Sequence, residues 1–413
     1  MVKRERLQRI LLFVLLFGSM LILGLVENIK AVSFPLIRDE FAVPFRRQGL
    51  MVSLLSCAYF VFNIVAGIWI GRSGARPPSI AGYAVICLGL LLVPVMPGFF
   101  WIGVALFIIF SGFGFLDIGM NALASRVFVT KAALLMNLLH SSYGIGSMAG
   151  PFLAGLLVGG SGFDWRHAYL FSLPPVLLLF ALMFFVRFSE SGRLSQAGEL
   201  QPAAPATDSD VPATKARSGK SFLDALRMPL VWLLATALGL GIVLEATSSN
   251  WGPLYFRDIH GLDPATDGAA FLSTFFLLFT VSRLLCGPFL ERLGYVRSLI
   301  AISFLIIAVY LVGFALGARG ILVLPALGFF VALYWPTLMA VAIVSFGRDA
   351  PVCIGAMIAI AGLINAVMQF VVGLVNSALG PAWGYRSSLV YAVLMILVLT
   401  ILYRKLRGKF RLL

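Results

Sequence analysis

The chain has 413 residues, of which 61% are hydrophobic and 12% are charged, and its formal net charge is +14. This composition excludes a soluble globular domain, which needs a polar surface, whereas lipid accepts an apolar one. The basic residues lie in short segments between apolar runs and not on one amphipathic face, so a nucleic-acid-binding protein is also excluded.

Twelve apolar runs are each close to the length of about 20 residues that a membrane-spanning helix requires. They are residues 10–34, 48–70, 78–97, 101–123, 134–158, 168–187, 229–252, 269–290, 298–317, 320–345, 353–378 and 387–403. The segment between the sixth and seventh runs is rich in Ala, Pro, Ser and charge, which is typical of a flexible linker. The sequence predicts an all-α membrane protein with a six-helix bundle at 1–188, a linker at 189–227 and a second bundle at 228–413.

Most of the 31 Lys and Arg residues fall on the side of the membrane that would carry both termini and the linker. Because basic loops are retained in the cytoplasm, both termini are predicted to be cytoplasmic. A multi-pass protein of the cell membrane, expected to be a bacterial inner membrane, follows from this pattern. We expect a monomer surrounded by lipid.

The two halves of the chain repeat one another. "GLVENIKAVSFPLIRD" at 24–39 and "GIVLEATSSNWGPLYFRD" at 241–258 align Glu27 with Glu245, and each segment ends in Arg-Asp. "GIWIGRSGAR" at 67–76 aligns with "GPFLERLGYVR" at 287–297, and "WRHAY" at 165–169 aligns with "YRSSLVY" at 385–391. Three landmarks at nearly one spacing along the chain predict two pseudo-symmetric six-helix halves.

Two such halves joined by a cytoplasmic linker resemble the major facilitator superfamily over the whole chain. The loop after the second span resembles the superfamily's G-x-x-x-D-R-x-G-x-R motif, with Gly71 in place of the acid. The resemblance implies a cytoplasmic hinge between helices here, and a structural or gating role for an arginine in span eight. The residues concerned are Gly67, Arg72, Gly74, Arg76, Arg283, Gly287, Glu291 and Arg292.

"SGFGFLDIGMNALASRVF" in span four and "NLLHSSYGIGSMAGPFLAG" in span five resemble the fucose:proton symporter family and its relatives, which include sodium-dependent glucose transporters. The resemblance implies symport of a sugar-like solute. In that family an acid of span four, followed by Asn four residues on, takes part in proton coupling, and Asp117 with Asn121 fits this position. The family's aspartate in span one is replaced here by Ala31.

Three acids lie inside the spans, namely Glu27, Asp117 and Glu245. A charge at the bilayer centre costs at least about 2.5 kcal/mol, so such acids are functional candidates. Asp117 and Asn121 share a helix face, and a carboxylic acid in a low-dielectric cavity can exchange a proton near neutral pH. We expect the three acids to bind the coupling ion, a proton or sodium.

Glu27 and Lys30 are one helical turn apart and allow two interpretations. They neutralise each other and the solute is neutral, or Lys30 is free to hold an anion. In span eleven Asn365, Gln369 and Asn376 form a polar stripe, which is predicted to face a cavity because amides facing lipid are costly. The candidate substrate-binding residues are Lys30, Asn28, Asn121, Asn137, His140, Tyr143, Trp251, Trp335, Asn365 and Gln369.

The sequence therefore predicts a secondary transporter of a small polar, sugar-like solute, working by alternating access and coupled to a cation. "GSMAGPFLAG" at 146–155 also resembles a motif of drug:proton antiporters, so a proton-coupled exporter of drugs or metabolites is an alternative, as is an organic-anion transporter using Lys30. The absence of a Walker A motif, a nucleophile elbow and metal-ligand spacing predicts no enzyme activity, no cofactor and no metal site.

Overall fold

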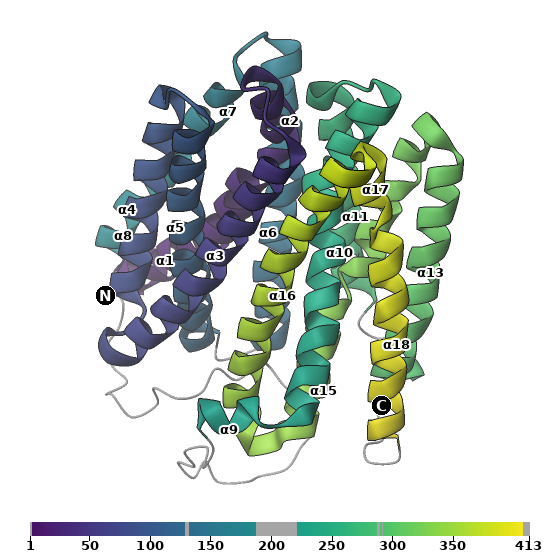
Figure 1. Ribbon diagram of the computed structural model, residues 1–413. Coiled ribbons are helices and arrows are strands. Elements are labelled where there is room, and N and C mark those ends of the chain that lie inside the picture. Colours follow the sequence, from purple (N-terminus) through teal and green to yellow (C-terminus); the bar gives the residue numbers. More distant parts are fainter. Residues whose placement is uncertain (1, 129–131, 187–220, 287–289, 291, 408–413) are drawn as a thin grey trace.

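The computed structural model describes residues 2–128, 132–186, 221–286, 290 and 292–407, with side chains from residue 6 on and, after the first gap, from residue 135 on. In this part of the chain 11 helical segments are long and apolar enough to span a membrane. The longest of them, Gly317–Leu379, contains two spans that pack against each other and that Gly347 separates with a φ of 53°. The fold is the predicted all-α architecture of twelve spans (Figure 1).

The spans of the first half are α1 (Val2–Asn28) with α2 (Lys30–Glu40), α3 (Phe45–Ser73), α4 (Arg76–Leu92), α5 (Phe99–Val127), α6 (Ala132–Gly155), and α7 (Trp165–Phe171) with α8 (Leu173–Phe185). Those of the second half are α10 (Pro229–His260), α11 (Ala269–Leu285), α13 (Tyr295–Ala315), α14 (Leu327–Val331) with α15 (Tyr334–Phe346), α16 (Ala350–Leu379), and α17 (Pro381–Arg386) with α18 (Ser388–Leu406). The short helix α9 (Phe222–Leu226) precedes α10.

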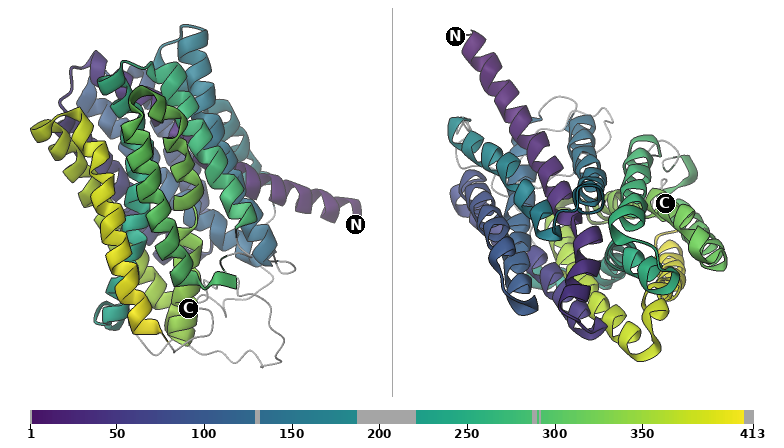
Figure 2. Two further views of the ribbon diagram at one scale, coloured as in Figure 1. Left: turned by 90° about the vertical axis from the view of Figure 1, so that its right-hand side faces the viewer. Right: turned by 90° about the horizontal axis from the view of Figure 1, so that it is seen from above.

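The two halves are built alike. The pairs α1–α6, α3–α5 and α4–α8 pack together in the first half, and their counterparts α10–α16, α11–α14 and α13–α18 pack together in the second. Buried apolar side chains form two clusters, one for each half, and Figure 2 shows the helices of each half side by side. The pseudo-symmetry expected from the sequence repeat is confirmed, while the domain boundary at 188 lies outside the described residues and stays a prediction.

Two helices extend well beyond the apolar runs that predict them. Those runs place the end of the first span at 34 and of the seventh at 252, whereas α2 continues to Glu40 and α10 to His260. Charged side chains in these last turns pair across the two halves: Arg38 Nη1 lies 2.7 Å from Asp258 Oδ2, and Arg257 Nη1 lies 2.7 Å from Asp39 Oδ2. Because each charge has a partner of opposite sign, these last turns can pack against each other between the two halves, and the helices continue beyond the apolar runs.

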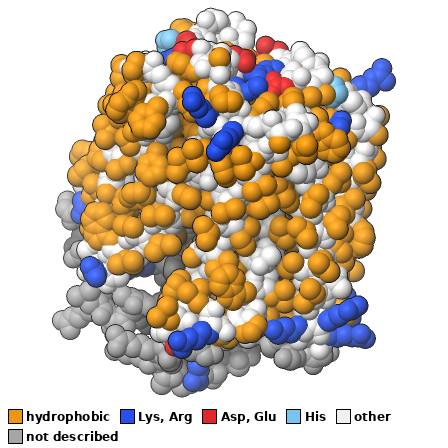
Figure 3. Space-filling view, viewed as in Figure 1, with side chains coloured by type: hydrophobic (Ala, Val, Ile, Leu, Met, Phe, Trp, Pro, Cys, Tyr) orange, Lys and Arg blue, Asp and Glu red, His pale blue; other side chains and the backbone are white. Residues whose placement is uncertain are grey.

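These four residues, Arg38, Asp39, Arg257 and Asp258, are called the clasp, and the end of the molecule that carries them the clasp end. The opposite end, which carries Ser221 and Gly74, is the linker end. Hydrophobic side chains cover the middle of the molecule and charged ones gather at its two ends (Figure 3), as expected of a protein that crosses a bilayer.

The tenth span is less regular than its apolar run of 320–345 predicts. It begins with 3₁₀ turns at Gly317–Leu322 and Leu324–Ala326, continues as α14, and is broken at Ala332 and Leu333 before α15. Apolar composition determines that a segment crosses the membrane but not that it does so as one helix.

The two halves meet along α3–α16 and α6–α11. A Cβ on Gly49 would lie 2.8 Å from Gly373 Cα, so α3 and α16 touch near the clasp end. Gly67 lies about five helical turns after Gly49, and Gly355 about five turns before Gly373, so each pair shares a helix face. A Cβ on Gly67 or on Gly355 would have nothing within 4 Å. The two helices thus touch at the clasp end and diverge toward the linker end.

Candidate functional site

Asp117 on α5 is held by two neutral donors. Tyr59 Oη on α3 donates to Asp117 Oδ2 at 2.6 Å, and Asn121 Nδ2 donates to Oδ1 at 2.8 Å. Gly114 permits this approach of α3 and α5, since a Cβ there would lie 2.5 Å from the Tyr59 carbonyl oxygen. Within the described residues no cation pairs with Asp117, and Asn121 Oδ1 is buried without a hydrogen-bond partner. The Asp117 site therefore offers oxygen atoms to a cation.

Glu27 and Lys30 lie on either side of Ile29, where α1 passes into α2 and the backbone keeps a helical conformation with a φ of −52° and a ψ of −28°. Lys30 Nζ donates to Glu27 Oε1 at 3.4 Å, and Tyr143 Oη on α6 donates to Glu27 Oε2 at 2.9 Å. Lys30 Nζ also lies 5.8 Å from the centre of the Phe110 ring, and its side chain is only 8% exposed. Of the two interpretations, this geometry matches the paired one.

Glu245, the repeat-mate of Glu27, faces a second group of charges. It lies within electrostatic range of Arg283, Glu27 and Lys30. The Arg283 guanidinium packs 4.2 Å from the Phe279 ring centre, and its Nε donates to the Ala332 carbonyl at 3.4 Å, at the break between α14 and α15.

Two further pairs of residues belong to this arrangement. His140 on α6 lies within electrostatic range of Arg283, and Asp117 within that of Glu27. The structure thus brings the three predicted acids together with Lys30, Arg283 and His140, from both halves.

The polar stripe of α16 does not line an open space. Gln369 is 0% exposed, and its amide bonds to Trp251 Nε1 at 3.0 Å, Asn250 Nδ2 at 3.3 Å and Thr247 Oγ1 at 3.5 Å, all on α10. Asn365 is 4% exposed and donates to Ser56 Oγ on α3 at 3.3 Å. The expectation that the stripe faces a cavity is wrong for this conformation, because the amides bond to neighbouring helices.

The remaining candidates for substrate binding are scattered. Trp251 is buried and donates to Gln369, so its ring packs in the second-half cluster. Trp335 is half-buried against the same cluster. Asn28 donates back to the Gly24 carbonyl at 3.0 Å within α1, and Asn137 is exposed on α6. Their roles in binding a substrate stay predictions.

The motif loop forms a sharp turn between α3 and α4. Gly74 has a φ of 79°, and its repeat-mate Gly294 a φ of 88°, values that favour glycine over any other residue. Arg72 and Arg292 are exposed, and Arg76 Nη2 donates to the Met183 carbonyl at 3.5 Å. Gly287 and Glu291 lie outside the described residues.

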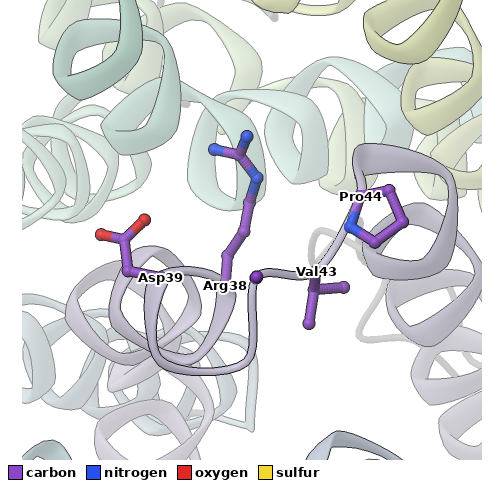
Figure 4. A pocket seen from close by; sticks show the side chains of 5 residues that line it. Arg38, Asp39, Val43 and Pro44 are labelled. Atoms are coloured by element: carbon purple, nitrogen blue, oxygen red, sulfur yellow. The ribbon is translucent and has the colours of Figure 1, made fainter.

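The clasp is more than two ion pairs. Arg257 also contacts Asp258 Oδ1 at 2.5 Å and donates to the Pro35 carbonyl at 2.8 Å, while the Arg38 guanidinium lies 3.8 Å from the Phe45 ring centre. A hollow that is open to the surface lies here, lined by Arg38, Asp39, Ala42, Val43 and Pro44, and Figure 4 shows Arg38 and Asp39 leaving α2 in different directions beside it. These contacts join the two halves at the clasp end.

Sequence analysis missed several residues of the site. The sequence signal for Tyr59 is weak: it is the one tyrosine of the second predicted span and therefore its one phenolic donor. Ser56, Thr247 and Asn250 were missed because their partners lie on other helices. The clasp residues stand out in the sequence as a repeat, but the sequence does not indicate that they pair across the two halves.

The comparisons with known proteins agree with this architecture. A model of the Major Facilitator Superfamily matches residues 16–352, so the chain belongs to this superfamily. It is a membrane transporter, not an enzyme. A search of curated proteins found no match.

Among solved structures, the fucose:proton symporter of E. coli, as an asparagine-to-alanine variant, is 19% identical, with 96% of this chain and 99% of that chain covered and a TM-score of 0.60. A bacterial homologue of the human lysosomal transporter Spinster, in an inward-facing and unoccupied conformation, is 13% identical with 96% of both chains covered and a TM-score of 0.73. A structure of the fucose transporter in the outward conformation gives 19% identity, coverage of 96% and 99%, and a TM-score of 0.59. At these identities the likeness establishes the fold.

Proposed function

We propose that this transporter carries a small, neutral, polar solute of the sugar class by cation-coupled symport. One observation carries the proposal: Asp117 is an intramembrane carboxylate whose hydrogen-bond donors, Tyr59 and Asn121, are both neutral. An unpaired carboxylate in a low-dielectric site has a strong preference for a bound cation, a proton or sodium. Binding of that cation next to Glu27 would change the charge of the whole central cluster.

A neutral solute is supported by the environment of Lys30. Its ammonium group is matched by Glu27 at 3.4 Å and faces the Phe110 ring, so it has no charge to spare for an anionic substrate. The resemblance to sugar symporters favours the same class. One structural neighbour is itself a fucose:proton symporter, which is consistent with it.

The site lies between the two halves, where alternating access exposes it to each side in turn. We assign the linker end to the cytoplasm, because basic loops are retained there. The clasp then closes the outer side, and the divergence of α3 and α16 opens the site inward. Solute and cation stabilise a common state, so each raises the affinity for the other.

An uptake screen in proteoliposomes tests the proposal. Sugars, small carboxylates and amphipathic cations are offered with a proton gradient, a sodium gradient or neither. Accumulation of a sugar that depends on one of the two gradients supports the proposal. Accumulation of carboxylates would move the substrate to the organic anions, and extrusion of amphipathic compounds against a proton gradient would favour the exporter.

A further inference from the structure

The clasp end carries a second pair of repeat-mates that differ between the halves. Arg166 and Arg386 occupy equivalent positions in the matching segments "WRHAY" and "YRSSLVY". Arg166 is fully compensated: its Nη2 lies 2.5 Å from Glu40 Oε1, and its Nη1 lies 3.2 Å from Asp164 Oδ2. The first half therefore neutralises this guanidinium with two carboxylates of its own.

The second half lacks both carboxylates. After the shared Arg-Asp pair the first half continues with Glu40, whereas the second continues with Ile259 and His260. Gly384 precedes Arg386 as Asp164 precedes Arg166, with a single residue between them in each case. A Cβ on Gly384 would collide with the Asn376 side-chain amide, so an acid does not fit there.

Arg386 is consequently left without an acid. Within the described residues it has no ion pair and no side-chain hydrogen bond, and its Nε is buried with no partner. His260 lies within electrostatic range of Arg386 but cannot supply the missing negative charge. The two acids that follow, Asp263 and Asp267, are occupied by backbone N–H groups of their own turn.

The surroundings of Arg386 are those of the membrane interface. The guanidinium lies 5.8 Å from the ring centre of Trp383 and 5.9 Å from that of Phe314. Trp383 is 52% exposed and the nearby Leu379 is 64% exposed, on the helix α17 and at the end of α16 that Figure 1 places at the clasp end. Exposed tryptophan and apolar side chains of this kind mark the headgroup level of a bilayer.

We propose that Arg386 and His260 form a binding site for a phosphate group, supplied by a lipid headgroup of the leaflet at the clasp end. Guanidinium binds the oxygens of phosphate in a two-pronged fashion, which supplies the acceptors that Glu40 and Asp164 give to Arg166. Free inorganic phosphate has the same chemistry, so the two sources must be separated by experiment. The site stands apart from the central cluster and does not depend on the solute.

The test measures binding of a short-chain phosphatidylglycerol, and separately of inorganic phosphate, to the purified full chain in detergent by thermal shift and native mass spectrometry. Arg386→Gln should weaken lipid binding at least about tenfold, the equivalent of one charge-assisted hydrogen bond. His260→Glu should weaken it equally while leaving the ligand-free protein at least as stable, because it places an acid within electrostatic range of Arg386. Arg348→Gln, an exposed arginine of the same half at the linker end, is the matched control and should bind as the parent does.

If inorganic phosphate bound as tightly as the lipid, the site would still bind an anion, but the proposal that a lipid headgroup supplies it would be overturned. Equal lipid binding by the parent, Arg386→Gln and His260→Glu would overturn the proposal. An equal loss in Arg348→Gln would also overturn it, since it would show attraction by the whole basic surface.

Discussion

The clasp and the central cluster use the same duplicated framework in opposite ways. At the clasp each half contributes an Arg-Asp pair, and each arginine binds the aspartate of the other half at 2.7 Å. In the centre the first half places Asp117 between neutral donors, whereas the second places Glu245 near Arg283 and a buried amide network around Gln369. The clasp joins the two halves through equivalent partners, whereas the acids of the central cluster have different partners in each half.

The helices that carry these groups are alike in their backbone. Ile29, between Glu27 and Lys30, keeps a helical conformation with a φ of −52° and a ψ of −28°, and α10 runs unbroken through Glu245 to His260. The irregular span is the tenth, in the second half, which is broken at Ala332 and Leu333. Around the acids, the two halves therefore differ in the side chains that contact them and not in an interruption of the first span.

Removing the charge of Asp117 should have the largest effect. Asp117→Asn keeps the shape of the side chain but cannot bind a proton or sodium as a carboxylate does. Concentrative uptake in proteoliposomes should be abolished while exchange of solute without a gradient is retained. Asp263→Asn, at a turn outside the membrane centre, is the matched control. Unchanged accumulation in Asp117→Asn would show that this residue has no part in coupling, and the difference between the two halves at the centre would then have another cause.

The Glu27–Lys30 pair should come next. Each single change, Glu27→Gln or Lys30→Gln, leaves a buried charge without its partner, a loss of roughly 3–5 kcal/mol, and should stop transport. The double change Glu27→Lys with Lys30→Glu keeps a pair at i, i+3 and should recover a large part of the uptake rate.

A different result would change the substrate class. A raised apparent substrate constant in Lys30→Ala, without rescue in the double change, would mean that Lys30 holds an anion. Competition by small carboxylates in the same uptake assay would identify that anion.

The fold could be predicted almost completely from the sequence, because apolar run length, the position of basic loops and an internal repeat each depend on local composition. The acids could also be predicted, since a charge in a bilayer stands out. Their hydrogen-bond partners could not be predicted, because these lie on other helices. Tyr59 on α3 donates to Asp117 on α5, and Gln369 on α16 accepts from Trp251 on α10. The glycine motif "GSMAGPFLAG" shows why a motif alone does not identify a function. A Cβ on Gly146 would collide with the Leu21 carbonyl oxygen, so close packing of α6 against α1 is enough to explain the glycine.

Weakening the clasp should have a moderate effect on accessibility. In a background without the four cysteines, Gln48→Cys reports on the α3–α16 contact near the clasp end, because this residue is buried there. Arg257→Gln should raise its rate of labelling by a polar thiol reagent about tenfold and Arg38→Gln a few-fold, since an ion pair of this exposure contributes about 1 kcal/mol and Arg257 makes additional contacts.

The control for the clasp is Arg319→Gln, which should leave the labelling rate unchanged. Equal labelling in all three variants would show that the halves are held together by helix packing alone, and the clasp would then lose its role in closing this end.

The smallest effect is expected at two equivalent turns, one in each half, where Gly74 and Gly294 have a positive φ. Gly74→Ala and Gly294→Ala each force an L-residue into a conformation with positive φ, at a cost of roughly 1–3 kcal/mol. Thermal unfolding of the purified protein should show a similar loss of stability for each variant and an additive loss for the double variant, because the two turns lie in different halves.

Gly98→Ala is the matched control: its φ of −167° suits any residue, and an added Cβ would have nothing within 4 Å. If Gly74→Ala were as stable as this control, the glycines would be kept for helix movement during transport, and the turns would belong with the central cluster among the functional parts of the repeat.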